Sequence, residues 1–462
     1  MLGMILALAV TVWIAVMLVR KHYAPGILLI GGFVLITVSV LLGTGKLIDP
    51  KFATGFVPFD IFEAVRRMFA TRTSGLGLQI MMIAGYSTYM DKIHASDALC
   101  NIFASPLKKL HSPMLVFALA FIITQFLSIF VPSGAGMALL AMITFYPILI
   151  RAGLSRLTAL AIICSTRMFG WGPASPNVNF GCGLLNSDVT EYFLVYQSPI
   201  VLFTLVFVLA AHLIVQPYWD RNEGPDIEGM HKLEEMTETK GEVPLIYAIL
   251  PVLPLVLIMG CSPLVTAYFG FPWKIKLNIA NAMFMCTFLA FVFEIIHRRN
   301  FTEALKVFKE YFIAMGRIFT LVVCLIVAGE VFAKGLMMTG TLDALVASAQ
   351  SAGLGAKTLI TACCLVTMIS ATLMGSGNAA FFSFAAMVPN IAASLDIDPV
   401  VMTVAIDEFA SFGRTISPIF GAIIAVSGIA GVSPFQAAKR TLIPTLVGAC
   451  VALPFIFVYF DL

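Results

Sequence analysis

The sequence is poor in charged residues. Asp, Glu, Lys and Arg make up 11% of its 462 residues, whereas a soluble globular chain carries roughly 25%. Hydrophobic residues account for 60%, and the mean hydropathy is +0.98. This composition excludes a soluble globular domain and predicts an all-α polytopic membrane protein, with the lipid bilayer as its surroundings.

Residues and motifs that would support catalysis or ATP hydrolysis are also scarce. The six histidines fall outside all the candidate site segments described below, and the nine cysteines are scattered through apolar runs, where they behave as small hydrophobic side chains. No Gly-x-x-x-x-Gly-Lys-Ser/Thr motif occurs, which argues against ATP-driven pumping by this chain. We therefore predict that the protein is not an enzyme, has no metal site or cofactor and binds no nucleic acid.

The N-terminal apolar run lacks the features of a cleavable signal peptide. No basic residue precedes it, no small-residue cleavage site follows it, and the basic pair Arg20-Lys21 comes after it. These features predict a retained first helix with its N-terminus outside.

Apolar runs of about 20 residues are long enough to cross a bilayer, and ten such crossings are expected. They are 2–20, 25–44, 75–92, 156–186 (broken), 197–217, 244–268, 275–297, 314–333, 400–430 (broken) and 441–459. Two further stretches, 113–151 and 356–395, each hold two short apolar arms around a Gly/Ser tip. We interpret each of these as a re-entrant hairpin.

Helix-breaking residues recur at matching places in the two halves of the chain, at an offset of 242 or 243 positions. The first copy reads Val131-Pro132-Ser133-Gly134-Ala135-Gly136 and then Gly172-Pro173-Ala174-Ser175-Pro176-Asn177; the second reads Gly375-Ser376-Gly377-Asn378-Ala379 and then Gly413-Arg414-Thr415-Ile416-Ser417-Pro418. Interrupted apolar segments in corresponding positions of two halves are the best sequence indication of a transporter's binding site.

The distribution of basic residues orients the chain. Counted over alternate loops, 17 Lys and Arg residues fall on one side and 9 on the other, so the first side is predicted to be cytoplasmic and both termini periplasmic. Each half then holds five crossings and one hairpin. Because five is odd, the second half enters from the opposite side, which gives two inverted-topology repeats.

This topology divides the chain into three parts. Residues 1–219 form the first repeat, 220–243 a polar cytoplasmic linker and 244–462 the second repeat. Within them we expect scaffold helices in 1–74 and 197–217, a hairpin and broken helix in 113–186, a second hairpin in 356–395 and a second broken helix in 400–430. Two amphipathic stretches, 59–72 and 301–312, are expected to lie on opposite membrane surfaces.

The four interruptions are the predicted substrate site. Non-helical backbone inside a membrane must be buried in protein or line a cavity, and free N–H groups at helix N-termini favour anions. The alternative is that Gly and Ser only allow close helix packing. The predicted substrate-binding residues are Ser133, Gly134, Ala135, Gly136, Ser175, Pro176, Asn177, Gly375, Ser376, Gly377, Asn378, Ala379, Arg414, Thr415, Ser417 and Pro418.

Four charged residues lie near these interruptions. Arg414 could bind a substrate carboxylate bidentately, or it could form an ion pair with Asp407 or Glu408 on the same segment. The two acids could instead carry a coupling proton. Arg167, several residues before the first break, could sit near a surface or near the cavity.

The second copy resembles the anaerobic C4-dicarboxylate carriers of the DcuC type, in the ion transporter superfamily. The matching strings are Gly375–Ala379, Gly413–Pro418, Val432-Ser433-Pro434-Phe435 and Lys439-Arg440-Thr441. The resemblance implies an elevator-type homodimer in a bacterial inner membrane that carries succinate, fumarate, malate or aspartate. It further implies uptake, efflux or exchange, and Na⁺ or H⁺ is the expected coupling ion of a symporter.

The first copy departs from that family pattern. It reads Pro173-Ala174-Ser175-Pro176-Asn177 where such carriers read roughly Pro-Thr-Ser-Gly-Asp, and Arg167 and Trp171 replace small apolar residues. The Asp407-Glu408 pair is also unusual for the family. The alternatives are therefore a transporter of the same fold for another small carboxylate or amino acid, and an anion channel.

Overall fold

The protein is helical throughout the part of the chain that the structure describes. The computed structural model describes residues 2–462 apart from 21, 45–46, 111, 224–243, 271, 273–274, 276, 342–343 and 345–354, and no β-strand occurs among those residues. The predicted linker 220–243 therefore falls almost wholly outside the described residues. Its first residue, Asp220, is helical and binds Arg440.

The first half consists mainly of α-helices, with two π-helical turns (η2, η4) and two short 3-10 turns (η1, η3). They are α1 (Leu2–Val19), α2 (Ala24–Leu41), η1 (Pro50–Phe52), α3 (Val57–Arg72), η2 (Thr73–Gly77), α4 (Leu78–Lys92), α5 (Ala95–Ala104), η3 (Ser105–Lys109), α6 (Pro113–Phe130), α7 (Gly134–Thr144), α8 (Tyr146–Arg151), α9 (Arg156–Cys164), α10 (Pro176–Leu185), α11 (Val189–Glu191), η4 (Tyr192–Gln197) and α12 (Ser198–Glu223).

The second half repeats much of this order. It contains η6 (Leu245–Val252), α14 (Leu253–Cys261), α15 (Pro263–Phe269), α16 (Ile279–Arg298), α17 (Phe301–Ile318), the π-helical turn η7 (Phe319–Val323), α18 (Cys324–Met338), α20 (Ala356–Met374), α21 (Gly377–Ala385), α22 (Val388–Ser394), α23 (Pro399–Thr415), α24 (Gly421–Ala430) and α25 (Pro434–Tyr459).

Eight helices among the described residues are long and apolar enough to cross a membrane, or nine if the pair Leu245–Cys261 and Pro263–Phe269, bent by 69°, is one span. The expected crossing at 75–92 is helical but is not among them. Both arms of the first predicted hairpin are among these eight helices, because Pro113–Phe130 and Gly134–Arg151 are each 18 residues long and apolar. These arms are longer than the sequence suggested, and the hairpin stays a prediction.

The two amphipathic stretches are not separate helices. α3 continues through η2 into α4, and α17 continues through η7 into α18, so each stretch is the first part of a longer helix. The two long helices pack against each other: α3 contacts α18, α4 contacts α17, and the π-helical turns meet. This antiparallel crossing joins the two halves of the chain, and the inverted repeats stay a prediction.

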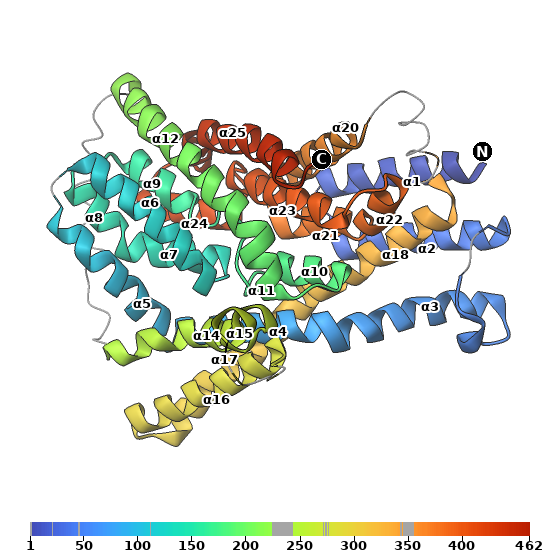
Figure 1. Ribbon diagram of the computed structural model, residues 1–462, viewed down its shortest axis with the longest axis horizontal. Helices are drawn as coiled ribbons and strands as arrows, with labels where there is room; N and C mark the ends of the chain where they lie inside the picture. Colours follow the sequence, from blue (N-terminus) through green and yellow to red (C-terminus); the bar gives the residue numbers. More distant parts are fainter. Residues whose placement is uncertain are drawn as a thin grey trace.

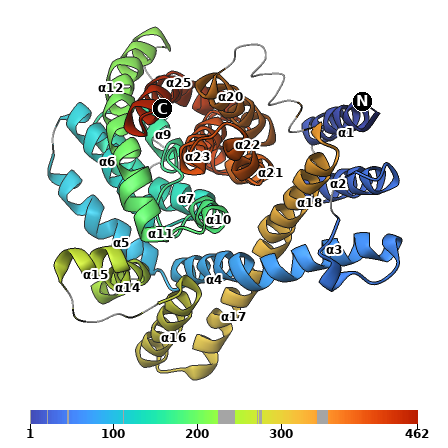
Figure 2. The same cartoon turned by 45° about the vertical axis from the view of Figure 1, so that its right-hand side comes forward.

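The helices divide into spatial groups. In Figures 1 and 2, α1, α2 and α18 lie together on the side of the N-terminus, α5 and α6 lie at the opposite end, and α23 lies between them. α23 packs against α20, α21 and α25. All its residues from Val400 to Thr415 are buried, so α23 is the central helix of the molecule.

Candidate functional site

The four predicted interruptions are real breaks in the helices. α6 and α7 are separated by residues 131–133, α9 and α10 by 165–175, α20 and α21 by 375–376, and α23 and α24 by 416–420. We call these tip 1, break 1, tip 2 and break 2. Ser and Gly lie in or next to each of them, and Pro lies in all but tip 2, as their sequences predict.

The breaks approach one another closely. A Cβ atom built on Gly134, beside tip 1, would lie 3.1 Å from Phe420 Cζ in break 2. One built on Gly375, in tip 2, would lie 2.7 Å from the Ile419 carbonyl oxygen of the same break. Break 1 joins the group through Gly170, whose Cβ would collide with the Ser411 hydroxyl of α23. The structure thus brings all four interruptions together around α23.

The two tips are built alike. The Ser133 hydroxyl accepts a hydrogen bond from the Gly136 N–H at 3.1 Å, and the Ser376 hydroxyl accepts one from the Ala379 N–H at 3.2 Å. Each serine is therefore the N-cap of the helix that follows its tip, and leaves further N–H groups of the first turn for other acceptors.

The other predicted hydroxyls act mainly on the backbone. Thr415 donates to the Ser411 carbonyl at 2.9 Å, and Ser417 donates to the Thr372 carbonyl at 2.6 Å. Ser175 is buried and precedes α10 without capping it through its side chain. The Ser417 bond holds break 2 against α20, and the Thr415 bond stays within α23.

Break 1 is fastened to α23 by amides. Asn177 Nδ2 donates to Asp407 Oδ1 at 2.7 Å, and Gln197 Nε2 donates to Asp407 Oδ2 at 3.3 Å. Gln197 also accepts from the Gly172 N–H at 3.4 Å. A carboxylate buried to 0% exposure is thus held by neutral donors from two other elements.

Arg414 does not form the ion pair that the sequence left open. Among the described residues its guanidinium donates from Nη1 to Asn378 Oδ1 at 3.3 Å and from Nη2 to the Arg167 carbonyl at 2.7 Å. The salt bridges present elsewhere in the described chain include neither Asp407 nor Glu408. Arg414 therefore links tip 2 to break 1 through neutral acceptors.

Arg167 lies inside break 1 rather than before it, because α9 ends at Cys164. Its side chain is 4% exposed, and its Nη1 donates to the Ser128 carbonyl near the end of α6 at 2.7 Å. The surface position that the sequence allowed for Arg167 is wrong. The residue is buried beside Arg414.

Glu408 lies next to Asp407 on α23 and has a different environment. It is 1% exposed, and neither carboxylate oxygen has a hydrogen-bond partner among the described residues. The centre of the site therefore combines two buried guanidinium groups and two buried carboxyl groups. In the described part of the chain, no three His, Cys, Asp or Glu side chains are grouped so as to hold a metal ion.

Several polar residues of the site were missed from the sequence. Gln197 holds Asp407. Gln125 Nε2 donates to the Ser165 carbonyl at 2.8 Å, and the backbone carbonyl of Gln125 accepts from Trp171 Nε1 at 3.2 Å. The signal in the sequence was an amide side chain inside or next to an apolar run. A polar side chain is costly to bury in lipid, so its presence there indicates a functional or structural role.

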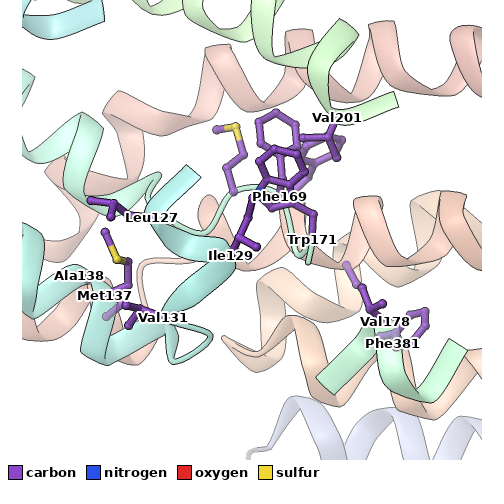
Figure 3. Close-up of a cluster of buried hydrophobic side chains, with 14 of the residues drawn as sticks. Leu127, Ile129, Val131, Met137, Ala138, Phe169, Trp171, Val178, Val201 and Phe381 are labelled. Carbon is purple, nitrogen blue, oxygen red and sulfur yellow. The ribbon is translucent and has the colours of Figure 1, made fainter. Parts of the chain in front are cut away.

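Apolar side chains surround this polar centre. In Figure 3, Phe169 and Trp171 from break 1 lie together beside Val201 of α12, with Ile129 of α6 nearby. Trp171 is 2% exposed. Such a shell lowers the local dielectric and strengthens charge–charge interactions within it.

A cavity of about 660 Å³ lies outside this polar centre, because none of Arg167, Asp407, Glu408 and Arg414 lines it. It is bordered by residues at the start of α4, along α10 and around α14 and α15, among them Gln79, Asn179 and Ser262. Asn179 Nδ2 donates to the carbonyls of Pro173 and Ser175 at 2.7 and 2.8 Å. The cavity therefore borders the helix that begins at break 1.

Known proteins resemble this chain over nearly its whole length. The family model described as "C4-dicarboxylate anaerobic carrier" (DcuC) matches residues 2–460. The anaerobic C4-dicarboxylate transporter DcuC of Escherichia coli K12 is 30% identical over 450 residues, covering 97% of this chain and 95% of the relative. The probable transporter of that name from Vibrio cholerae is 29% identical over 453 residues, covering 97% and 96%.

Two solved membrane transporters share the fold. The Alcanivorax borkumensis YdaH transporter superposes with a TM-score of 0.63 at 15% identity, covering 95% of this chain and 98% of that one. Neisseria gonorrhoeae MtrF superposes with a TM-score of 0.63 at 13% identity, covering 95% of both chains. The curated relatives are transporters and not enzymes.

Proposed function

The chain belongs to the DcuC family of C4-dicarboxylate anaerobic carriers, and from that premise we propose that it is a secondary active transporter of small dicarboxylates. Its substrates are succinate, fumarate, malate or aspartate, moved across a bacterial inner membrane by alternating access. It works as an exchanger or as a cation-coupled symporter.

The observation that carries this proposal is the environment of Arg414. Its guanidinium is 5% exposed and touches only neutral acceptors among the described residues. A buried cation is costly unless a negative charge accompanies it. A substrate carboxylate in contact with Arg414 supplies a charged acceptor that the protein does not place against its donors, and a guanidinium fork fits a carboxylate bidentately.

The helix ends around Arg414 support an anionic substrate. α7, α10 and α21 begin at tip 1, break 1 and tip 2, and their first N–H groups carry partial positive charge. The residues of the two tips and of break 1 bind the carboxylates, and an elevator-type movement of this region against α2, α4, α16 and α18 exposes the site to each side in turn. The working unit is a homodimer.

Charge balance supports coupling to a cation. When Asp407 and Glu408 are ionised, their two negative charges offset the two guanidinium groups, so an entering dianion brings uncompensated charge into a buried site. Na⁺ or H⁺ at the two acids restores neutrality. In exchange mode, a second dicarboxylate leaves in place of the first.

The test is exchange in reconstituted liposomes. Vesicles loaded with succinate should take up labelled fumarate through the purified protein, and protein-free vesicles should not. Absence of exchange with every dicarboxylate would exclude this substrate class. A thermal-shift screen of mono-, di- and tricarboxylates and amino acids, with and without sodium, would then identify another small carboxylate or amino acid as the substrate.

Two further measurements test the rest of the proposal. Conductance at rates above those of an alternating-access carrier, without coupled counterflow, would identify an anion channel instead. The orientation, with both termini periplasmic, follows from the excess of basic residues on one side. Alkaline phosphatase fused after Leu462 should be active in cells, and a fluorescent protein fused there that folds only in the cytoplasm should stay dark.

A further inference from the structure

Two buried arginines meet at the centre of the site, one from each half of the chain. Arg167 is 4% exposed and Arg414 is 5% exposed. They are neighbours, because Arg414 Nη2 donates to the backbone carbonyl of Arg167 at 2.7 Å. The Arg414 guanidinium thus contacts the backbone of a residue whose own side chain is a second buried cation, and burying two cations in one site requires compensating negative charge.

The protein places no carboxylate against either group. Among the described residues, no acidic oxygen lies within the 4.0 Å limit of a salt bridge to Arg167 or Arg414. Asp407, which lies on the same helix as Arg414, is bound by the amides of Asn177 and Gln197 instead. The acids thus balance the arginines at a distance without occupying their donors.

Both arginines keep donors without an acceptor. The Nε groups of Arg167 and Arg414 are buried and have no hydrogen-bond partner among the described residues. Their remaining bonds go to the Ser128 carbonyl, the Asn378 amide oxygen and the Arg167 carbonyl, which are all neutral. These bonds orient the two guanidinium groups and leave their positive charges available to an anionic ligand.

We propose that Arg167 and Arg414 each bind one carboxylate of the same substrate molecule, so that Arg167 determines the preference for dicarboxylates over monocarboxylates. This inference rests on the proposed function and extends it. A C4-dicarboxylate carries a carboxylate at each end, which matches a site with one guanidinium from break 1 and one from α23. A monocarboxylate would leave the donors of one of the two guanidinium groups without a charged acceptor.

The test compares succinate with succinamate, in which one carboxylate is replaced by a neutral amide of similar shape. Binding is measured on wild type, Arg167→Gln and the control Arg66→Gln, which removes an exposed arginine on α3. One charge-assisted contact corresponds to about a 10- to 100-fold preference for succinate in wild type and in the control. In Arg167→Gln, succinate affinity should fall to the level of succinamate, while succinamate affinity stays unchanged.

Other outcomes overturn the inference. Equal losses for both ligands in Arg167→Gln would mean that Arg167 only supports the backbone at Ser128. If Arg167→Gln does not fold, Arg167→Met decides, because it keeps a long side chain and removes the charge: retaining the full succinate preference contradicts the proposal, and a reduced preference supports it. If the wild-type protein binds no dicarboxylate, the proposed function fails together with this inference. If the wild type binds succinate and Arg167→Gln keeps the full succinate preference, only this inference fails.

Discussion

Asn177 and Asp407 are 230 positions apart in the sequence and are joined by a hydrogen bond of 2.7 Å between Asn177 Nδ2 and Asp407 Oδ1. Asn177 lies in the first turn of α10, and Asp407 lies in the middle of α23. The bond therefore connects the break of the first half to the central helix of the second half. Its partners are buried to 1% and 0% exposure, so water does not compete for it.

Asn177→Ala should lower the stability of the protein. The variant removes one of the two amides that bind Asp407, and leaving a buried carboxylate short of a donor costs about 1–3 kcal/mol. Thermal unfolding in detergent should show a lower Tm, and dicarboxylate exchange should fall as well. The matched control is Asn101→Ala on α5, where the side chain is exposed. An unchanged Tm for Asn177→Ala would mean that this bond does not hold break 1.

Arg414→Ala should abolish transport without unfolding the protein. Truncating one partner of a buried charge contact costs about 2–5 kcal/mol, or a ~30-fold or larger loss of substrate affinity. Exchange of labelled fumarate measures the effect, and size-exclusion chromatography checks folding. Arg66→Ala, at an exposed position, is the control. Wild-type exchange by Arg414→Ala would contradict the assigned role.

Much of the fold was predictable because a lipid environment restricts which residues can form membrane-spanning helices and which can interrupt them. The apolar runs predicted most of the helices. Helix-breaking residues predicted where the helices are interrupted, namely Pro132, Pro173, Gly375 and Ser417. Both signals are local. Backbone that leaves the helix inside a membrane needs residues that permit it, and these residues are visible in one sequence.

Contacts between distant segments were not predictable in the same way. The bond from Gln197 to Asp407 spans 210 positions, and no spacing rule connects the two residues. Arg440 follows Lys439 in the sequence, and nothing local shows that it is 1% exposed and bound to Asp220 of α12. The stretches 59–72 and 301–312 looked like separate surface helices, and their sequences did not show that α3 and α17 continue through η2 and η7 into the next helices.

Gly377→Ala should separate tip 2 from α23. A Cβ atom at Gly377 would lie 2.6 Å from the Ala410 carbonyl oxygen and 3.0 Å from Arg414 Cδ, so backbone or the arginine would have to move. Overpacking of this kind typically costs about 1–3 kcal/mol. We expect loss of exchange activity. Gly421→Ala, in the first turn of α24 with no atom within 4 Å of its Cβ position, should transport normally. Equal activity of the two variants would show that tip 2 need not pack this closely.

Asp220→Ala should destabilise the protein and leave transport per folded molecule unchanged. Asp220 Oδ1 accepts from Arg440 Nη1 at 2.7 Å, and its carboxylate also accepts from Ser155 and Thr158 at 2.8 Å. Loss of charge-assisted bonds of this kind costs about 1–3 kcal/mol. The double variant Asp220→Ala, Arg440→Met should recover part of the lost Tm because it also removes the buried charge. A double variant less stable than the single one would argue against this pairing.

Glu408→Gln should separate exchange from cation-driven uptake. The substitution keeps the shape of a side chain that is 1% exposed and removes its charge. In wild type, a cation would have to neutralise Glu408 before the substrate-loaded site can move across the membrane. In the variant, the neutral glutamine lets the substrate-loaded site move without that cation. Succinate–fumarate exchange should therefore continue, whereas uptake driven by a sodium or proton gradient should be lost. Glu303→Gln, at an exposed glutamate bound to Lys306 on α17, is the control and should keep both activities. Gradient-driven uptake by Glu408→Gln at the wild-type rate would exclude Glu408 as a coupling residue and leave Asp407 as the acid to examine in this site.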